Sequence, residues 1–105
     1  MKGEKNQITR RIREAVRELD PKAQVILFGS RARGDAKKDS DWDVLILIDN
    51  PVTIDISRSF RYKLFDLELE TDEVFSTFVY NKKVWNTKHK VTPFYKNVKN
   101  EGVLL

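Results

Sequence analysis

Two apolar runs enclose a polar segment in residues 25–48, which read VILFGSRARGDAKKDSDWDVLILI. The first run is rich in β-branched residues and stops at Gly29, as expected of a buried strand. The second run follows two carboxylates and is apolar on both faces, which is typical of a central strand. We therefore expect two neighbouring strands, about 23–28 and 41–49, joined by a polar loop over 29–40.

The start of this loop has the residues of an anion site. Gly29 lets the backbone turn tightly and approach a ligand with no Cβ in the way. Ser30 follows at the expected start of a short helix, where a hydroxyl and free backbone N–H groups suit an anion. Arg31, Arg33 and two lysines add positive charge nearby. The loop therefore predicts a phosphate cradle.

Two carboxylates at the start of the second strand indicate a metal site. Asp41 and Asp43 are two positions apart, so their side chains share one face of a strand. Two such carboxylates repel each other unless a cation lies between them. Mg²⁺ takes oxygen ligands and usually binds through one or two carboxylates together with substrate phosphates. The alternative, a solvated acidic strand end in a βαβ-like turn, leaves the pairing of the carboxylates unexplained.

The pattern of Gly-Ser, Gly and Ser-Asp-x-Asp before an apolar strand resembles the nucleotidyltransferase signature of the DNA polymerase β superfamily, in particular its minimal bacterial and archaeal members. The resemblance implies an α+β (α/β-like) fold, a small mixed sheet with helices on one side. It also implies that Asp41 and Asp43 bind the metal. Arg31 and Arg33 would each either neutralise the charge of the nucleotide phosphates or pair with a structural carboxylate. The matching residues are Gly29, Ser30, Gly34, Ser40, Asp41 and Asp43, of which Gly29, Ser30 and Ser40 are assigned to the nucleotide.

The resemblance further implies an activity and a partner. With two Mg²⁺ ions and a nucleoside triphosphate, ATP or another, an acceptor hydroxyl would attack the α-phosphorus and release pyrophosphate. Minimal nucleotidyltransferases of this type resemble antitoxins that pair with a HEPN-domain protein. We expect one domain over residues 1–105, too short to include a separate acceptor-binding domain. The acceptor would then come from a protein partner or from a second subunit of a homo-oligomer.

The third carboxylate of the superfamily has no clear counterpart. It should lie on the next strand, expected at about 73–80, and counting back from a turn at Asn81 places Ser76 there. The nearest acids, Asp72 and Glu73, are either exposed turn residues or, with a shifted register, a source of the third group. Glu73 is an odd number of positions from Ser76 and therefore points to the opposite face, roughly 10 Å away along the strand. Two hypotheses remain: an enzyme, or a degenerate nucleotide-binding module that controls a partner.

The remaining segments predict helices that cover the sheet. Apolar residues at helical spacing indicate helices over 6–19 and 55–69, the second with Asp55 as its N-cap. Thr92 and Gly102 mark the two ends of a short C-terminal helix. No internal repeat or interdomain linker interrupts this order.

Composition narrows the function classes. There are no cysteines, which excludes disulfides and thiolate zinc sites, and a single histidine, which excludes a multi-histidine metal site. We expect a cytoplasmic protein with no membrane segment, because no signal peptide or long apolar run is visible. Six lysines and no acids occur over 74–100, interleaved with aromatics. A solvated face with packed aromatics is favoured over nucleic-acid binding, because the net charge of +4 is mild.

Overall fold

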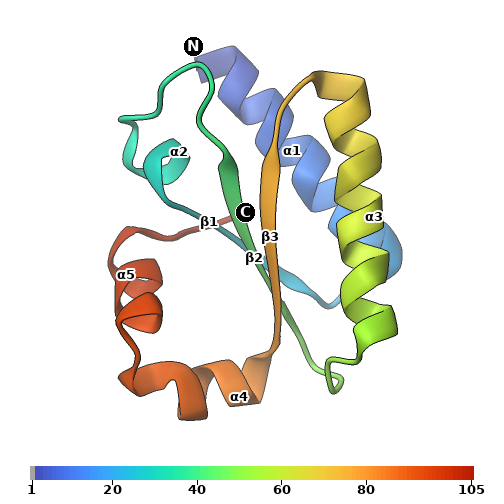
Figure 1. Ribbon diagram of the computed structural model, residues 1–105, viewed down its shortest axis with the longest axis vertical. Helices are drawn as coiled ribbons and strands as arrows, with labels where there is room; N and C mark the ends of the chain where they lie inside the picture. The colour runs from blue at the N-terminus through green and yellow to red at the C-terminus, as the bar shows by residue number, and fades with distance from the viewer. Residues whose placement is uncertain (1) are drawn as a thin grey trace.

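The computed structural model describes the backbone of residues 2–105 and the side chains from residue 7 onward. In order its elements are α1 (Lys2–Leu19), β1 (Gln24–Phe28), α2 (Ser30–Arg33), β2 (Trp42–Ile48), α3 (Ile54–Thr71), β3 (Phe75–Asn81), α4 (Lys82–Thr87), the 3₁₀ helix η1 (Lys88–Val91), α5 (Pro93–Glu101) and β4 (Val103–Leu104). They alternate between helix and strand up to β3, after which α4, η1 and α5 follow one another before β4 (Figure 1). This arrangement confirms the expected α+β fold.

The four strands form one mixed sheet in the order β3-β2-β1-β4. β1 is antiparallel to both β2 and β4, whereas β2 and β3 are parallel. A parallel pair needs a crossover connection, and α3 supplies it. β2 is an inner strand and is buried from Val44 to Ile48, as its uninterrupted apolar run predicted. β4 was not expected, because two exposed residues are too short to show a strand pattern.

The long helices α1 and α3 lie side by side on one face of the sheet (Figure 1). Their apolar stripes meet alternate residues of β1 and β2. Each fully buried side chain of this size contributes roughly 1.5–3 kcal/mol, so this face holds most of the hydrophobic stabilisation. The buried residues here include Ile12, Val16, Val25, Leu27, Trp42, Val44, Ile46, Ile48, Phe60, Leu64 and Leu67.

The opposite face is covered by the C-terminal helices α4 and α5 (Figure 1). The expectation of helices on one side therefore holds for α1 and α3 but not for these two. The reason is that β2 is apolar on its second face too, through Leu45 and Leu47, and this face also needs cover. The tail aromatics provide it: Trp85 is buried and the Phe94 ring lies 5.4 Å from those of Phe28 and Phe78. The packing interpretation of these aromatics is confirmed.

Several element ends differ from the sequence predictions. The N-cap of α3 is Thr53, not Asp55, because the Thr53 hydroxyl accepts the Ile56 N–H at 3.1 Å. β3 starts at Phe75, not 73, because the chain first leaves α3 through Asp72 in a left-handed conformation. The caps of α5 are those predicted, Thr92 and Gly102.

Within the described chain, every helix is too short or too polar to cross a bilayer.

Candidate functional site

The site begins where β1 ends and β2 starts. The antiparallel register pairs Phe28 with Asp43, so the turn at Gly29 lies directly beside the Asp43 carboxylate. Gly29 is buried and has φ +76°, a region that side chains disfavour. A Cβ at this position would also lie 2.1 Å from Asp43 Oδ2. Both the backbone conformation and the available space therefore require glycine here.

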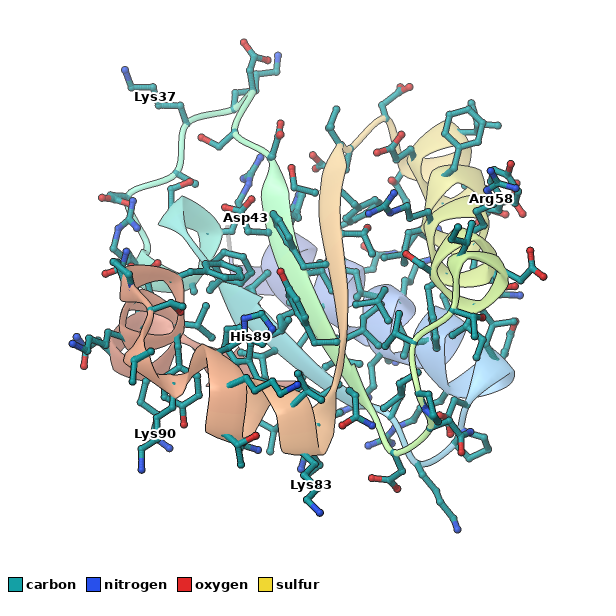
Figure 2. All side chains as sticks on the ribbon, turned by 60° about the horizontal axis from the view of Figure 1, so that its bottom comes forward. Lys37, Asp43, Arg58, Lys83, His89 and Lys90 are labelled. Carbon is teal, nitrogen blue, oxygen red and sulfur yellow. The ribbon has the colours of Figure 1, made fainter. Side chains whose placement is uncertain are left out.

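The two predicted metal ligands lie on one face of the sheet. Asp43 is half-buried at the start of β2, beside α2 (Figure 2), and the exposed Asp41 precedes the strand by one residue. Trp42, between them, points into the core under α1 and α3. Burial raises the pKa of Asp43, and the neighbouring charges of Asp41 and Glu101 raise that pKa further against the opposing effect of Arg33. The pair is thus electrostatically suited to a cation.

Strand β3 presents Ser76 to this pair. The parallel register sets Ser76 opposite Asp43, and the Ser76 hydroxyl donates a hydrogen bond to Asp41 Oδ2 at 3.0 Å. The residue found by counting back from Asn81 therefore does lie beside the carboxylate pair, and its side chain is a hydroxyl. Glu73 lies before the start of β3, and its carboxylate is 3.7 Å from the guanidinium of Arg31. Within the described chain no group of three or more acids, histidines or cysteines could hold a metal ion.

The short helix α2 connects the turn to the loop. Ser30 is its first residue, and Gly34 ends it in a left-handed conformation with φ +90°. The Gly34 N–H closes the turn on the Ser30 carbonyl at 2.9 Å. Both glycines of the pattern, Gly29 and Gly34, therefore have backbone conformations that other residues adopt only with strain.

Arg31 stabilises the loop between α2 and β2 through hydrogen bonds to its backbone. Its guanidinium donates to the carbonyls of Ser40 and Lys38 at 3.0–3.2 Å and lies 4.7 Å over the ring of Trp42. The hydroxyl of Ser40 is also used inside the loop, where it accepts the Lys37 N–H at 2.9 Å. The polar groups of both residues are thus engaged in loop structure, and their assignment to nucleotide stays a prediction.

Arg33 has a partner that the sequence analysis missed. Its guanidinium donates to Glu101 Oε2 at 2.8 Å, and the other oxygen of Glu101 accepts the Gly29 N–H at 3.0 Å. The Arg33 hydrogen bond lowers the pKa of Glu101, and Glu101 in turn raises the pKa of Arg33. One signal was available: a carboxylate in the last turn of a helix is unfavourable unless something compensates for it.

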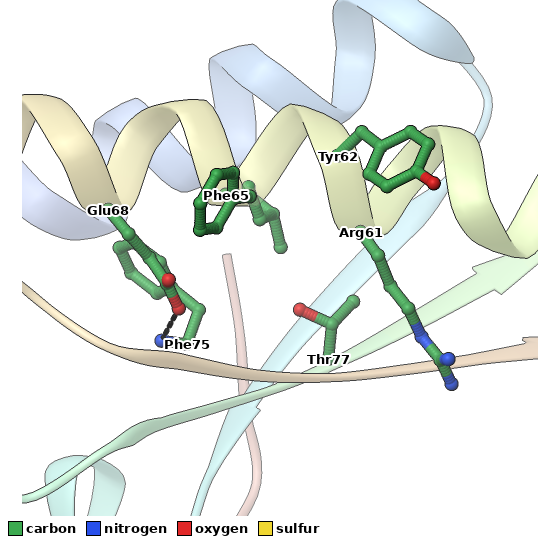
Figure 3. A pocket seen from close by; sticks show the side chains of 7 residues that line it. Arg61, Tyr62, Phe65, Glu68, Phe75 and Thr77 are labelled. Atoms are coloured by element: carbon green, nitrogen blue, oxygen red, sulfur yellow. Dashed lines mark hydrogen bonds between the residues drawn. The ribbon is translucent and has the colours of Figure 1, made fainter.

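A separate hollow of about 410 Å³ lies between α3 and β3. Figure 3 shows Tyr62 and Phe65 at its opening and Phe75 and Thr77 on the strand beneath. Phe75 belongs to the core under α1 and α3, so this hollow opens on the face opposite the carboxylates. It is not part of the candidate site.

Comparison with known proteins identifies the class. The model of a family described as nucleotidyltransferase domain matches residues 9–105, and the chain belongs to this family. Two proteins of Methanocaldococcus jannaschii, each named "Putative protein adenylyltransferase", are similar in sequence. One is 36% identical over 80 residues, covering 76% of this chain and 75% of the relative. The other is 35% identical over 88 residues, covering 78% and 76%.

Solved structures share the fold. A chain of a toxin–antitoxin crystallised with AMP-PNP superposes with a TM-score of 0.67 at 19% identity, covering 90% of this chain and 69% of that one. A chain of a mutant of the toxin–antitoxin MntA-HpeT gives a TM-score of 0.60 at 17% identity, covering 95% and 70%. At these identities the likeness concerns the fold alone.

Proposed function

We propose that this protein is a Mg²⁺-dependent nucleotidyltransferase. It would transfer a nucleoside monophosphate from a nucleoside triphosphate, with ATP as the favoured donor, to a hydroxyl of a protein partner. One observation carries the proposal: Asp41 and Asp43 share a face beside the Gly29–Ser30 turn, with Arg33 nearby. The names of the two relatives and the nucleotide analogue in one structural neighbour support an adenylyl donor.

The residues present fit a magnesium site. Asp41 and Asp43 offer oxygen ligands on one face, and burial together with the charges of Asp41 and Glu101 raises the pKa of Asp43, a cost that a divalent cation would offset. Bound Mg²⁺ would supply charge neutralisation at the phosphates and Lewis acidity at the reacting phosphorus. Ser76 orients Asp41 through its hydrogen bond. Gly29, Ser30 and Arg33 would hold the phosphates.

The acceptor completes the proposal. Its hydroxyl oxygen would bond to the α-phosphorus as the bond to pyrophosphate breaks, and the hydroxyl proton would leave to a base. A protein acceptor is supported by the relatives' names and by the toxin–antitoxin neighbours. We include a HEPN-domain protein among the partners to be tested first.

A second candidate function is a nucleotide-binding module without transfer. Ser76 favours it, because a hydroxyl is a poor metal ligand and base at the position where the superfamily has a carboxylate. Glu73 is a poor replacement, since it precedes β3 and its carboxylate lies 3.7 Å from the Arg31 guanidinium.

Labelled ATP with Mg²⁺ tests both candidates. The chain is incubated with the product of the neighbouring gene, and label on protein and pyrophosphate release are measured beside calorimetric binding of Mg²⁺-AMP-PNP. Asp41→Asn and Asp43→Asn should lose most of the binding and any transfer, whereas Asp39→Asn, an exposed acid of the same loop, should keep both. Binding without transfer supports the second candidate. Equal Mg²⁺-nucleotide affinity in all three variants and wild type contradicts the site itself.

A further inference from the structure

Two of the donors that the turn offers to an anion already bind a carboxylate of this chain. The Gly29 N–H is bound to one oxygen of Glu101, and the Arg33 guanidinium is bound to the other. The carboxylate thus spans a backbone amide and a guanidinium with two acceptor oxygens and one negative charge. Two non-bridging oxygens of a phosphate group would present the same pattern to these donors.

We propose that Glu101 is an internal occupant of the phosphate position, which the nucleotide must displace from Gly29 and Arg33 before it binds fully. This inference rests on the proposed function, because it assigns those donors to the phosphates. It gives α5 a role in setting nucleotide affinity that is separate from its role in covering the sheet.

Displacement needs only a side-chain movement. The backbone around Glu101 is held independently: Val98 is buried, the Gly102 N–H bonds the Val98 carbonyl at 2.7 Å, and the Leu105 N–H bonds the Val25 carbonyl at 2.8 Å. The Glu101 side chain is 21% exposed, so it is not enclosed by the fold. The carboxylate can therefore swing away while α5 and β4 stay in place.

Glu101 is poorly placed for a purely structural ion pair. Its carboxylate binds the N–H of Gly29, which lies directly beside Asp43, so its negative charge adds to that of the aspartate pair. A carboxylate in the last turn of a helix also lies at the end where negative charge is disfavoured. Its two contacts to the turn offset these costs, and a phosphate taking over the same donors would release Glu101 from both.

Glu101→Gln tests the proposal, because it keeps the side-chain shape and removes the charge that competes with phosphate. The matched control is Glu70→Gln, which also removes the charge of a glutamate paired with an arginine, here Arg11 on α1. Binding of inorganic tripolyphosphate without metal, and of Mg²⁺-AMP-PNP, is measured by calorimetry. Glu101→Gln should bind both about threefold to tenfold more tightly, the effect of losing one partly exposed charged contact. Glu70→Gln should match wild type.

The outcomes separate this inference from the proposed function. Equal affinity in Glu101→Gln and wild type would make Glu101 a structural link only. Weaker binding of Mg²⁺-AMP-PNP in Glu101→Gln would make it a contributing ligand. Either result overturns the inference, and the proposed function stands if Asp43→Asn still abolishes metal-dependent binding. Absence of all binding in wild type and in Glu101→Gln removes both.

A second measurement uses wild-type protein and does not depend on the stability of a variant. The amide resonance of Gly29 is followed by NMR during titration with tripolyphosphate. Its shift should change in step with the carboxylate resonance of Glu101, because the N–H exchanges one acceptor for another. A titration in which Gly29 moves and Glu101 does not would contradict displacement.

Discussion

Arg31 and Arg33 lie two positions apart in α2, and they anchor two different regions. Two residues on a helix point about 200° apart, so the side chains leave on opposite sides. Arg31 is 17% exposed and binds backbone carbonyls, Trp42 and Glu73. Arg33 is 47% exposed and binds the side chains of Asp35 and Glu101.

The comparison shows that one short helix makes two kinds of contact. Arg31 donates to backbone carbonyls, which no side-chain rotation can remove from its guanidinium. The carboxylate that meets Arg33 sits on a rotatable side chain, so its contact can be exchanged for a ligand at modest cost. We call the two sets of contacting residues the Arg31 region (Arg31, Trp42, Glu73) and the Arg33 region (Arg33, Glu101, Gly29).

The largest effect should come from the backbone of the Arg33 region. Gly29→Ala places a Cβ against Asp43 Oδ2 and adds strain at φ +76°, so the free energy of unfolding should fall by about 2–4 kcal/mol. Gly34→Ala is the control, because its φ is +90° but a Cβ meets no atom within 4 Å. It should cost about 1 kcal/mol from backbone strain alone. Urea denaturation measures both, and equal losses would show that the contact with Asp43 does not matter.

The two arginines themselves should separate stability from binding. Arg31→Met should lower the free energy of unfolding by about 1–3 kcal/mol, because partly buried loop carbonyls lose their donor and Trp42 loses its cation contact. Arg33→Met should change the free energy of unfolding far less, since the ion pairs of Arg33 are exposed. It should instead weaken tripolyphosphate binding. Thermal denaturation and calorimetry on the same samples test this, and the reverse pattern would invalidate the distinction between the regions.

Ser76 and Glu73 also have different partners: Ser76 donates to Asp41, whereas Glu73 lies beside Arg31. Transfer assays can sharpen this difference. Ser76→Asp places a carboxylate beside Asp41 and Asp43 and should raise transfer, by about tenfold or more if a base is what the site lacks. Glu73→Gln should change transfer little, because Glu73 faces Arg31. Pyrophosphate release reports both. A collapse of wild-type turnover in Glu73→Gln would make Glu73 the third catalytic carboxylate.

The smallest effect concerns acid stability. The pKa of Glu101 is lowered in the folded state, chiefly by the Arg33 hydrogen bond, so the folded form binds fewer protons at this group than the unfolded chain. The stabilisation is therefore present above the ordinary glutamate pKa and is lost as the pH falls below it. Glu101→Gln should flatten the decline of stability below about pH 4.5. Glu70→Gln is the control, because it removes a glutamate paired with an arginine away from the site. A similar flattening in Glu70→Gln would show that the effect does not depend on the contacts of Glu101.

Short-range pattern accounts for much of the fold and of the site. The apolar runs located β1 and β2, the even spacing placed Asp41 and Asp43 on one face, and the count from Asn81 found Ser76. The prediction of a helix end was wrong where two nearby residues are both suitable as the N-cap. Thr53 and Asp55 are both good caps, and only the backbone conformation at Thr53 decides between them.

The sequence by itself determined the strand–turn–strand unit, the glycine turn and the paired carboxylates, because these depend on alternation and chain stiffness over a few residues. The tertiary structure alone decided which arginine meets which partner, that the second face of the sheet is covered, and that Glu101 reaches Gly29. Those contacts join segments far apart in the chain. They depend on how α4 and α5 fold back across the sheet, and no local spacing encodes that path.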